Sequence, residues 1–198
     1  MVVKFISLVL CSVVVLGTPA LAQSYLGVQL AYGSGGKTDN QWTAASPRYR
    51  LPYGDAKSAS AIFGRDFGNW RGELELSGSK AGPTDSQPAA GVNFEAKDTY
   101  LSALASAHYD LPLTPGISAS VGVGAGPVRR KADLVQTTPL PVQSGAIRST
   151  NLAFFGQLGL NLEISSTVDV YSAFRAQRNG DSLNTWANNV WIGLRFKL

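Results

Sequence analysis

Apolar and polar residues alternate with a period of two through most of the chain, which is the pattern of a β-strand with one apolar face. In the last such segment, every second residue from Val190 to Leu198 is apolar, while Asn189 lies on the other face. The alternation predicts eight strands, at residues 25–33, 58–67, 70–79, 99–111, 117–128, 151–164, 168–177 and 189–198. The segment 58–67 is the least regular, because Ile62 falls on its polar face and Arg65 on its apolar face.

The connections between these strands alternate between short and long. Those at residues 68–69, 112–116 and 165–167 are short, whereas those at 34–57, 80–98, 129–150 and 178–185 are long and rich in Gly, Pro, Ser, Asp and Asn. Short turns at one rim and long loops at the other are typical of an up-and-down barrel with an even number of strands. The sequence therefore predicts an all-β fold, an eight-stranded antiparallel up-and-down barrel, without a second domain or a linker.

The N-terminus differs from the rest of the chain. Lys4 precedes a continuous apolar stretch at residues 5–16, and a small-residue Ala-Leu-Ala site follows at 20–22. This order predicts a secretory signal peptide at residues 1–22, cleaved after its last residue, and a barrel domain at residues 23–198. A transmembrane anchor is the alternative, but the apolar stretch is shorter than the roughly 20 residues that a spanning helix needs.

Composition helps to decide which face of the strands is enclosed. Hydrophobic residues make up 44% of the chain and charged residues 15%, against roughly 25% charged in a typical soluble domain. A soluble barrel has an apolar interior and a charged exterior, whereas a membrane barrel reverses this arrangement. The polar faces carry small residues that suit a crowded lumen, notably Gly27, Gly122, Gly124, Gly126, Gly159 and Gly193. These features favour a transmembrane β-barrel, with a soluble secreted barrel as the alternative.

Charged residues of both signs also fall on the polar faces. Because unpaired charges enclosed in a lumen are costly, we expect them to pair across the barrel as a structural plug. The predicted lumen charge network consists of Arg71, Glu73, Glu75, Glu163, Asp169, Arg175, Arg195 and Lys197. Glu73 and Glu75 also have the spacing of an acid pair of the glycosidase type, about 7 Å apart on one strand face. Aromatic residues near strand ends suit interfacial girdles: Tyr32, Phe67, Trp70, Tyr109 and Phe196.

Four segments carry a resemblance to a known family. They are residues 68–75 (GNWRGELE), 107–112 (AHYDLP), 121–126 (VGVGAG) and 193–198 (GLRFKL). In order and spacing they resemble the small outer-membrane β-barrels of Gram-negative bacteria, the opacity-protein-like and OmpA-like surface proteins, over essentially the whole mature chain. The resemblance implies localisation in the cell outer membrane. It also implies a C-terminal signal for the barrel-assembly machinery, carried by Gly193, Phe196 and Leu198, although that family usually ends in Phe or Trp.

The resemblance implies a non-enzymatic surface or structural protein that contributes to envelope integrity or adhesion. One alternative is an enzyme acting on lipid A, and another is a small-solute pore or carrier of a hydrophobic ligand. The single histidine, His108, is expected near the periplasmic end, away from lipid A, and is interpreted as part of a lumen hydrogen-bond network. No metal-binding or nucleotide-binding motif is present, so no cofactor is expected.

Cations in the long loops offer a candidate contact surface. Arg48, Arg50, Arg129, Arg130 and Lys131 are expected above the outer leaflet, where they could bind lipopolysaccharide phosphates. Solvated loop charge without a partner is the alternative. A host or envelope ligand is a further possible partner of the loops. The net charge of +4 is too small to indicate nucleic acid, and the single cysteine, Cys11, lies in the predicted signal peptide.

Overall fold

The computed structural model describes residues 22–34, 37–40, 49–83, 93–137, 143–180 and 186–198. The described residues form nine strands, β1(Gln23–Ser34), β2(Lys37–Asn40), β3(Tyr49–Asp66), β4(Trp70–Pro83), β5(Asn93–Thr114), β6(Ile117–Thr137), β7(Gln143–Ser165), β8(Val168–Asn179) and β9(Trp186–Lys197). In this part of the chain no helix is long and apolar enough to span a membrane. The predicted signal peptide lies outside the described residues except for Ala22.

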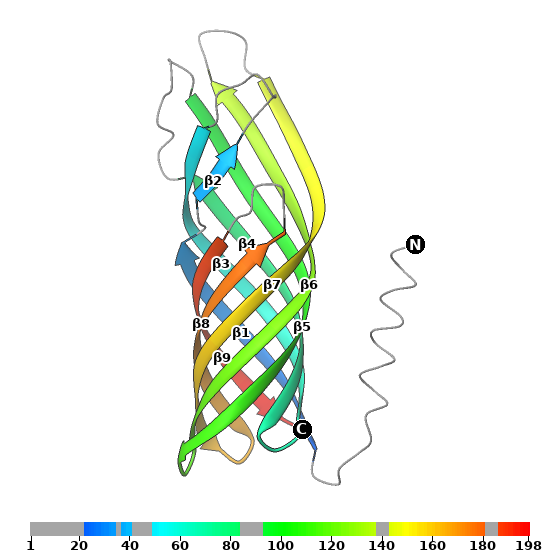
Figure 1. Ribbon diagram of the computed structural model, residues 1–198, viewed down its shortest axis with the longest axis vertical. Coiled ribbons are helices and arrows are strands. Elements are labelled where there is room, and N and C mark those ends of the chain that lie inside the picture. The colour runs from blue at the N-terminus through cyan, green and yellow to red at the C-terminus, as the bar shows by residue number, and fades with distance from the viewer. Residues whose placement is uncertain (1–21, 35–36, 41–48, 84–92, 138–142, 181–185) are drawn as a thin grey trace, which may run out of the picture.

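Eight of the strands close into an antiparallel barrel (Figure 1). Each barrel strand pairs with its neighbours along the chain, and β1 closes the ring by pairing with both β3 and β9. Strand β2 lies outside the ring and pairs with the first residues of β3. The predicted eight-stranded up-and-down topology is therefore confirmed. We call the end with the short turns the lower end and the end with the long connections the upper end.

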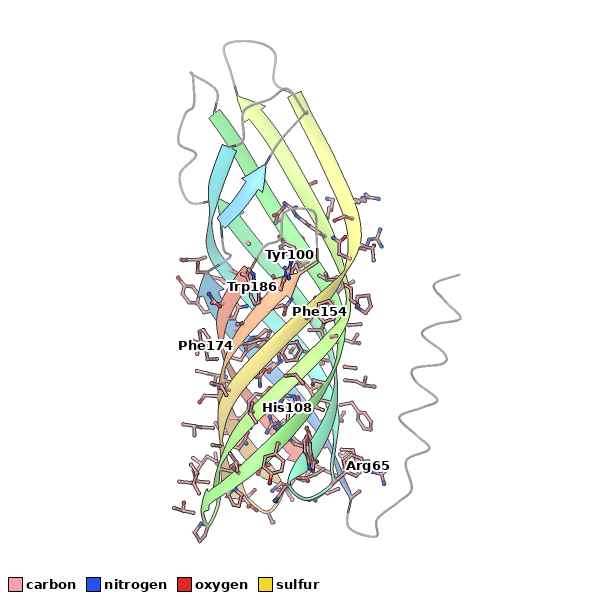
Figure 2. All side chains as sticks on the ribbon, viewed as in Figure 1. Arg65, Tyr100, His108, Phe154, Phe174 and Trp186 are labelled. Atoms are coloured by element: carbon pink, nitrogen blue, oxygen red, sulfur yellow. The ribbon has the colours of Figure 1, made fainter. Side chains whose placement is uncertain are left out.

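The faces of the strands follow the alternation of the sequence. Along β1, Leu26, Val28 and Leu30 are exposed on the outer wall, whereas Tyr25 and Gln29 are buried in the lumen. Strand β9 shows the same alternation. Figure 2 shows Phe174 projecting from the outer wall, and side chains also project along both edges of the barrel in this view. The barrel is thus apolar outside and polar inside.

The two exceptions in β3 lie where the alternation puts them. Ile62 is 3% exposed and packs in the lumen against Tyr25 and Tyr171. Arg65 projects from the outer wall near the lower end, with its guanidinium 5.7 Å from the ring centroid of Phe67 (Figure 2). The period of two therefore holds in β3 from Asp55 to Asp66, and only the residue types depart from it.

The upper strands are longer than the sequence predicts. Residues 129–150 were expected as one loop, but β6 continues to Thr137 and β7 begins at Gln143, with Lys131 directly opposite Arg148. Similarly, β3 begins at Tyr49 and β5 at Asn93. The alternation of apolar residues ends lower than the backbone pairing, because ladder hydrogen bonds do not require an apolar face. As a result β5, β6 and β7 rise above the other strands (Figure 1).

The lower turns are tight, as their sequences suggest. Gly68 and Gly116 have φ angles of 86° and 79°, a region that residues with a side chain rarely adopt. The Gly68 amide also donates to the Asp66 carboxylate at 2.8 Å. Beside this turn, the rings of Trp70 and Tyr109 pack edge to face on adjacent strands, with centroids 5.0 Å apart.

Candidate functional site

Arg175 is the centre of an upper cluster of lumen side chains. From β8 its Nη1 and Nη2 donate to the two carboxylate oxygens of Glu75 on β4, at 2.9 and 2.7 Å. Its Nε donates to Gln157 Oε1 at 2.9 Å. The guanidinium carbon lies 4.1 Å from the ring centroid of Phe155 and 4.7 Å from that of Trp191. With an exposed fraction of 1%, this cation is paired, hydrogen-bonded and enclosed by aromatic rings, which are the conditions for tolerating a buried charge.

Glu73, two residues before Glu75, is the centre of a lower cluster. Its Oε1 accepts a hydrogen bond from the Tyr25 hydroxyl at 2.5 Å and lies 3.4 Å from Nη2 of Arg195. The same oxygen lies 3.8 Å from Nη1 of Arg71, and Oε2 lies 3.2 Å from His108 Nε2. One carboxylate is therefore surrounded by polar groups from its own strand, β4, and from β1, β5 and β9.

A short relay connects the two clusters. The Tyr171 hydroxyl donates to Gln29 Oε1, and the Gln29 amide donates to Glu75 Oε2 at 2.9 Å. The guanidinium carbon of Arg195 also lies over the Tyr171 ring, 3.9 Å from the ring centroid, in a cation–π contact. Because Arg195 belongs to the lower cluster and Glu75 to the upper one, the buried polar groups form a continuous plug across the lumen.

The remaining predicted charges lie at the lower mouth. Lys197 Nζ is 3.0 Å from Asp169 Oδ1 and 3.3 Å from Glu163 Oε1. Nearby, Arg71 Nε lies 3.1 Å from Asp110 Oδ2, which makes these two residues an ion pair. A cavity of about 270 Å³ lies at this end and is lined by several of these charged groups. Thus the eight predicted network residues all face the lumen, but they divide into the upper cluster, the lower cluster and a trio at the mouth.

Cavities lie on either side of the plug and share no lining residue. On β4, Arg71 lines the lower cavity and Ser77 lines a smaller upper cavity of about 50 Å³. Glu73 and Glu75 stand between them along the strand, and both are 5% exposed or less. The two cavities are therefore separate, and neither Glu73 nor Glu75 lines either of them. Both carboxylates contact other lumen side chains instead.

His108 lies in the lower cluster, within reach of a serine and a carboxylate. Its Nε2 is 2.9 Å from Ser106 Oγ and 3.2 Å from Glu73 Oε2, and it is 1% exposed. In a hydrolytic triad, serine and carboxylate contact opposite nitrogens of the imidazole. Here both contact the same nitrogen, while Nδ1 has no partner among the described residues and faces Gly122. This geometry does not activate the serine.

The sequence missed several members of the plug. Gln29, Gln157 and Asn161 lie on the predicted polar faces, but they carry no charge and were not assigned to the network. Asn161 accepts from Arg195 at 2.9 Å and donates to Asp110 at 3.2 Å. Their position in the alternation, in phase with the charged residues, was the available signal. Among the described residues, no group of His, Cys, Asp or Glu side chains is placed to hold a metal ion.

The cations predicted as loop contacts are placed differently from one another. Arg48 lies outside the described residues, and for Arg50 only the backbone, in β3, is described. The other three lie in β6 and not in a loop, which corrects the prediction. Arg130 faces the lumen, where Nη2 is 2.8 Å from the buried carboxylate of Asp98. Arg129 and Lys131 are exposed on the outer wall, and Lys131 pairs with Asp133 at 2.9 Å.

On most strands, a cation lies on the outer wall just above the apolar residues. The first charged outward position above the apolar residues is Lys57 on β3, Lys80 on β4, Arg129 on β6 and Arg178 on β8, and Arg148 lies slightly higher on β7. All five are exposed. We call these five residues the rim cations. The sequence placed all five in the long connections, and of the five it named Arg129 as a lipopolysaccharide contact.

No protein-family model and no curated protein sequence matches the chain. Solved structures do match. Neisserial surface protein A is 14% identical, with 89% of this chain and 99% of that chain covered and a TM-score of 0.57. The attachment invasion locus protein of Yersinia pestis, in complex with the heparin analogue sucrose octasulfate, is 14% identical, with the same coverage and a TM-score of 0.52.

A major outer membrane protein from Thermus thermophilus is 10% identical, with 87% of this chain and 99% of that chain covered and a TM-score of 0.51. The chain has the fold of a small outer-membrane barrel. The resemblance inferred from the sequence is thus confirmed at the level of the fold. At sequence identities of 10–14%, the likeness to these structures concerns the fold and does not indicate which ligands this chain binds.

Proposed function

We propose that the chain is a non-enzymatic outer-membrane protein with a closed lumen and a surface or structural role. The observation that carries the proposal is the reversed barrel, with apolar side chains outside and buried ion pairs inside. On β4, Trp70 and Lys80 bound the apolar stretch of the outer wall. Ten residue steps measure about 33 Å along a strand, or about 25 Å in height at the usual tilt, which is the height of the apolar band of outer-membrane barrels. The predicted signal peptide at residues 1–22 is consistent with export.

The plug favours a structural protein over a pore or a ligand carrier. An eight-stranded barrel has a lumen that side chains just fill, and here the side chains that fill it are charged groups pairing with one another. Conduction would require Arg175 to leave Glu75, exposing two charges that are now satisfied. The lumen cavities do not favour a hydrophobic ligand, because the lower one is lined by charged groups and the upper one, at about 50 Å³, is smaller than a ligand pocket.

The arrangement around His108 does not favour the lipid A enzyme. The imidazole is enclosed in the lower cluster, and Ser106 and Glu73 share one of its nitrogens. A catalytic group must reach a substrate bond, and lipid A lies outside the barrel at the upper end. We therefore assign His108 a structural role, as a donor or acceptor that satisfies buried neighbours.

The rim cations support a contact with lipopolysaccharide. They lie at the level where the apolar wall ends, which is the level of the outer-leaflet phosphates in the proposed orientation. Arg129 and Arg148 are exposed and form no ion pair with a described residue. Guanidinium groups bind phosphates through charge-assisted hydrogen bonds. The surface role, whether envelope integrity or adhesion, would then rest on the raised upper parts of β5, β6 and β7.

Cell fractionation tests the proposed location. We expect the protein in the outer-membrane fraction, and we expect boiled and unboiled samples to migrate differently on a gel, because a closed barrel resists detergent until heated. Recovery of the protein in the soluble periplasmic fraction would contradict the proposal.

Planar lipid bilayers test the closed lumen. The refolded protein should produce no steady single-channel steps, because the plug divides the lumen. Regular conductance steps from the wild-type protein would show that the plug opens and would favour the pore. Mass spectrometry of lipid A from cells with wild-type protein and with His108→Ala tests the enzyme, and we expect identical lipid A from both.

A further inference from the structure

Lys57 on β3 and Lys80 on β4 are directly opposite one another in the strand register. Both are exposed on the outer wall, and neither has an ion pair with a described residue. Side chains directly opposite in an antiparallel pair have Cβ atoms about 5 Å apart, and like charges there are destabilising. The nearest outward carboxylate on β3, that of Asp55, accepts a hydrogen bond from the Tyr32 hydroxyl. Among the described residues, neither ammonium group therefore has an anion as its ion-pair partner.

An apolar groove lies on the outer wall below this lysine pair. Its volume is about 630 Å³. Its lining includes Ala59 and Ala61, the next two outward residues of β3, with Leu76 on β4 and Leu30 on β1. From β1 the lining continues to Ile192 and Leu194 on β9 and to Val170 on β8. On β4 the position beside Ala59 is Gly78, where an added side chain would meet no atom within 4 Å. The outer wall is therefore depressed directly beneath two cations that have no ion-pair partner in the described part of the chain.

We propose that this surface is a binding site for a phosphorylated lipid of the outer leaflet. Its phosphate lies between the ammonium groups of Lys57 and Lys80, and one of its acyl chains lies in the groove over Ala59 and Ala61. Charge complementarity selects the headgroup, because a phosphate replaces the missing anion of the lysine pair. The groove selects the chain through van der Waals packing, because the depressed wall lets an acyl chain make closer contact than a flat wall would. The inference rests on the proposed membrane location and names one lipid site within it.

The site predicts a reversal of sign in the effect of Lys80 on stability. Without lipid, Lys80→Gln removes a like-charge repulsion, so the barrel in zwitterionic detergent should unfold at an equal or higher urea concentration than wild type. In vesicles containing bisphosphorylated lipid A, the same variant loses a phosphate contact and should unfold at a lower urea concentration than wild type. A residue with only a structural role would shift both midpoints in the same direction, and that result would overturn the proposal.

Lipid titration of the full mature protein tests the site directly. Native mass spectrometry of the refolded barrel in zwitterionic detergent would follow binding of bisphosphorylated lipid A. We expect Lys57→Gln/Lys80→Gln to weaken binding about tenfold or more, since two charge-assisted contacts are lost. Arg65→Gln, the matched control on the outer wall of the same strand but at the lower end, should change the affinity less than about twofold. Equal effects of the two variants would overturn the site, because they would indicate general attraction by the net positive charge of the barrel.

Two further arms separate the headgroup from the chain. Wild-type protein should bind dephosphorylated lipid A about tenfold more weakly, which requires no variant to fold. Ala61→Phe fills the groove and should weaken binding of both lipid A forms. If inorganic phosphate at equal concentration displaces the lipid, the site is a simple anion site and the lipid assignment is wrong. Fractionation and bilayer recordings of the wild-type protein do not involve this lysine pair, so they test the proposed function separately.

Discussion

Gly122 lies directly opposite His108 in the β5–β6 pair, and the imidazole occupies the space where a side chain at residue 122 would stand. An ideal Cβ at this glycine would lie 2.1 Å from His108 Nδ1. The same relationship recurs in the lumen, where Gly64 faces Tyr25, Gly193 faces Tyr171 and Gly124 faces Phe155. Each of these large lumen side chains lies over a cross-strand glycine, an arrangement that also pins the strand register.

Gly122→Ala should destabilise the barrel. His108 cannot easily move aside, because Ser106 and Glu73 hold its Nε2 at 2.9 and 3.2 Å. Overpacking of this kind costs about 1–3 kcal/mol. The urea dependence of unfolding in lipid vesicles, followed by tryptophan fluorescence, measures the change.

Gly156→Ala is the matched control. This glycine lies on the outer wall, where an added Cβ meets nothing within 4 Å. Replacing it should be neutral or stabilising, by up to about 1 kcal/mol, because glycine weakens strands entropically. Equal losses at both positions would show that the imidazole does not determine the need for glycine at residue 122.

Arg175→Met should be among the most damaging single substitutions in the lumen. It leaves the Glu75 carboxylate buried without its cation, and removal of one partner from a buried pair costs about 3–5 kcal/mol. Adding Glu75→Gln removes the stranded charge, so the double variant should recover a large part of the loss. Equilibrium unfolding of the wild type, both single variants and the double variant gives the coupling between the two positions. Additive losses would contradict the assigned ion pair.

The period of two was sufficient to predict the barrel and the faces of its residues, because a strand turns every second side chain to the same side regardless of its partners. It placed Glu75 and Arg175 in the lumen from widely separated segments. It did not show which acid meets which base, because that depends on the register of strands distant in sequence. The upper strand ends were missed for a related reason. Asp98 and Arg130 were assigned to loops, and only the register brings their charges together.

Asp98→Ala should test whether the upper extension of β5 and β6 is stabilised from within. The carboxylate is 1% exposed and lies 2.8 Å from Arg130 Nη2, so its loss should cost about 3 kcal/mol or more. Asp133→Ala removes the exposed pair with Lys131 in the same sheet, which should cost less than about 1 kcal/mol. Hydrogen exchange of the β6 amides above Val128 should rise in the first variant only. Similar exchange in both would mean that the buried pair does not hold the extension.

Variants of the C-terminal strand can distinguish residues needed for packing in the lumen from residues needed for assembly into the membrane. The sequence resemblance assigned Gly193, Phe196 and Leu198 to the assembly signal, but Gly193 also faces Tyr171, whose ring would lie 2.6 Å from an added Cβ. Gly193→Ala should therefore lower the urea midpoint by the equivalent of about 1–3 kcal/mol. Phe196→Ala changes an exposed outer-wall residue, so it should mainly slow insertion into vesicles that contain the assembly machinery. Val190→Ala, an outer-wall change in the same strand, is the control. If it slows insertion as much as Phe196→Ala does, the C-terminal residues carry no separate signal.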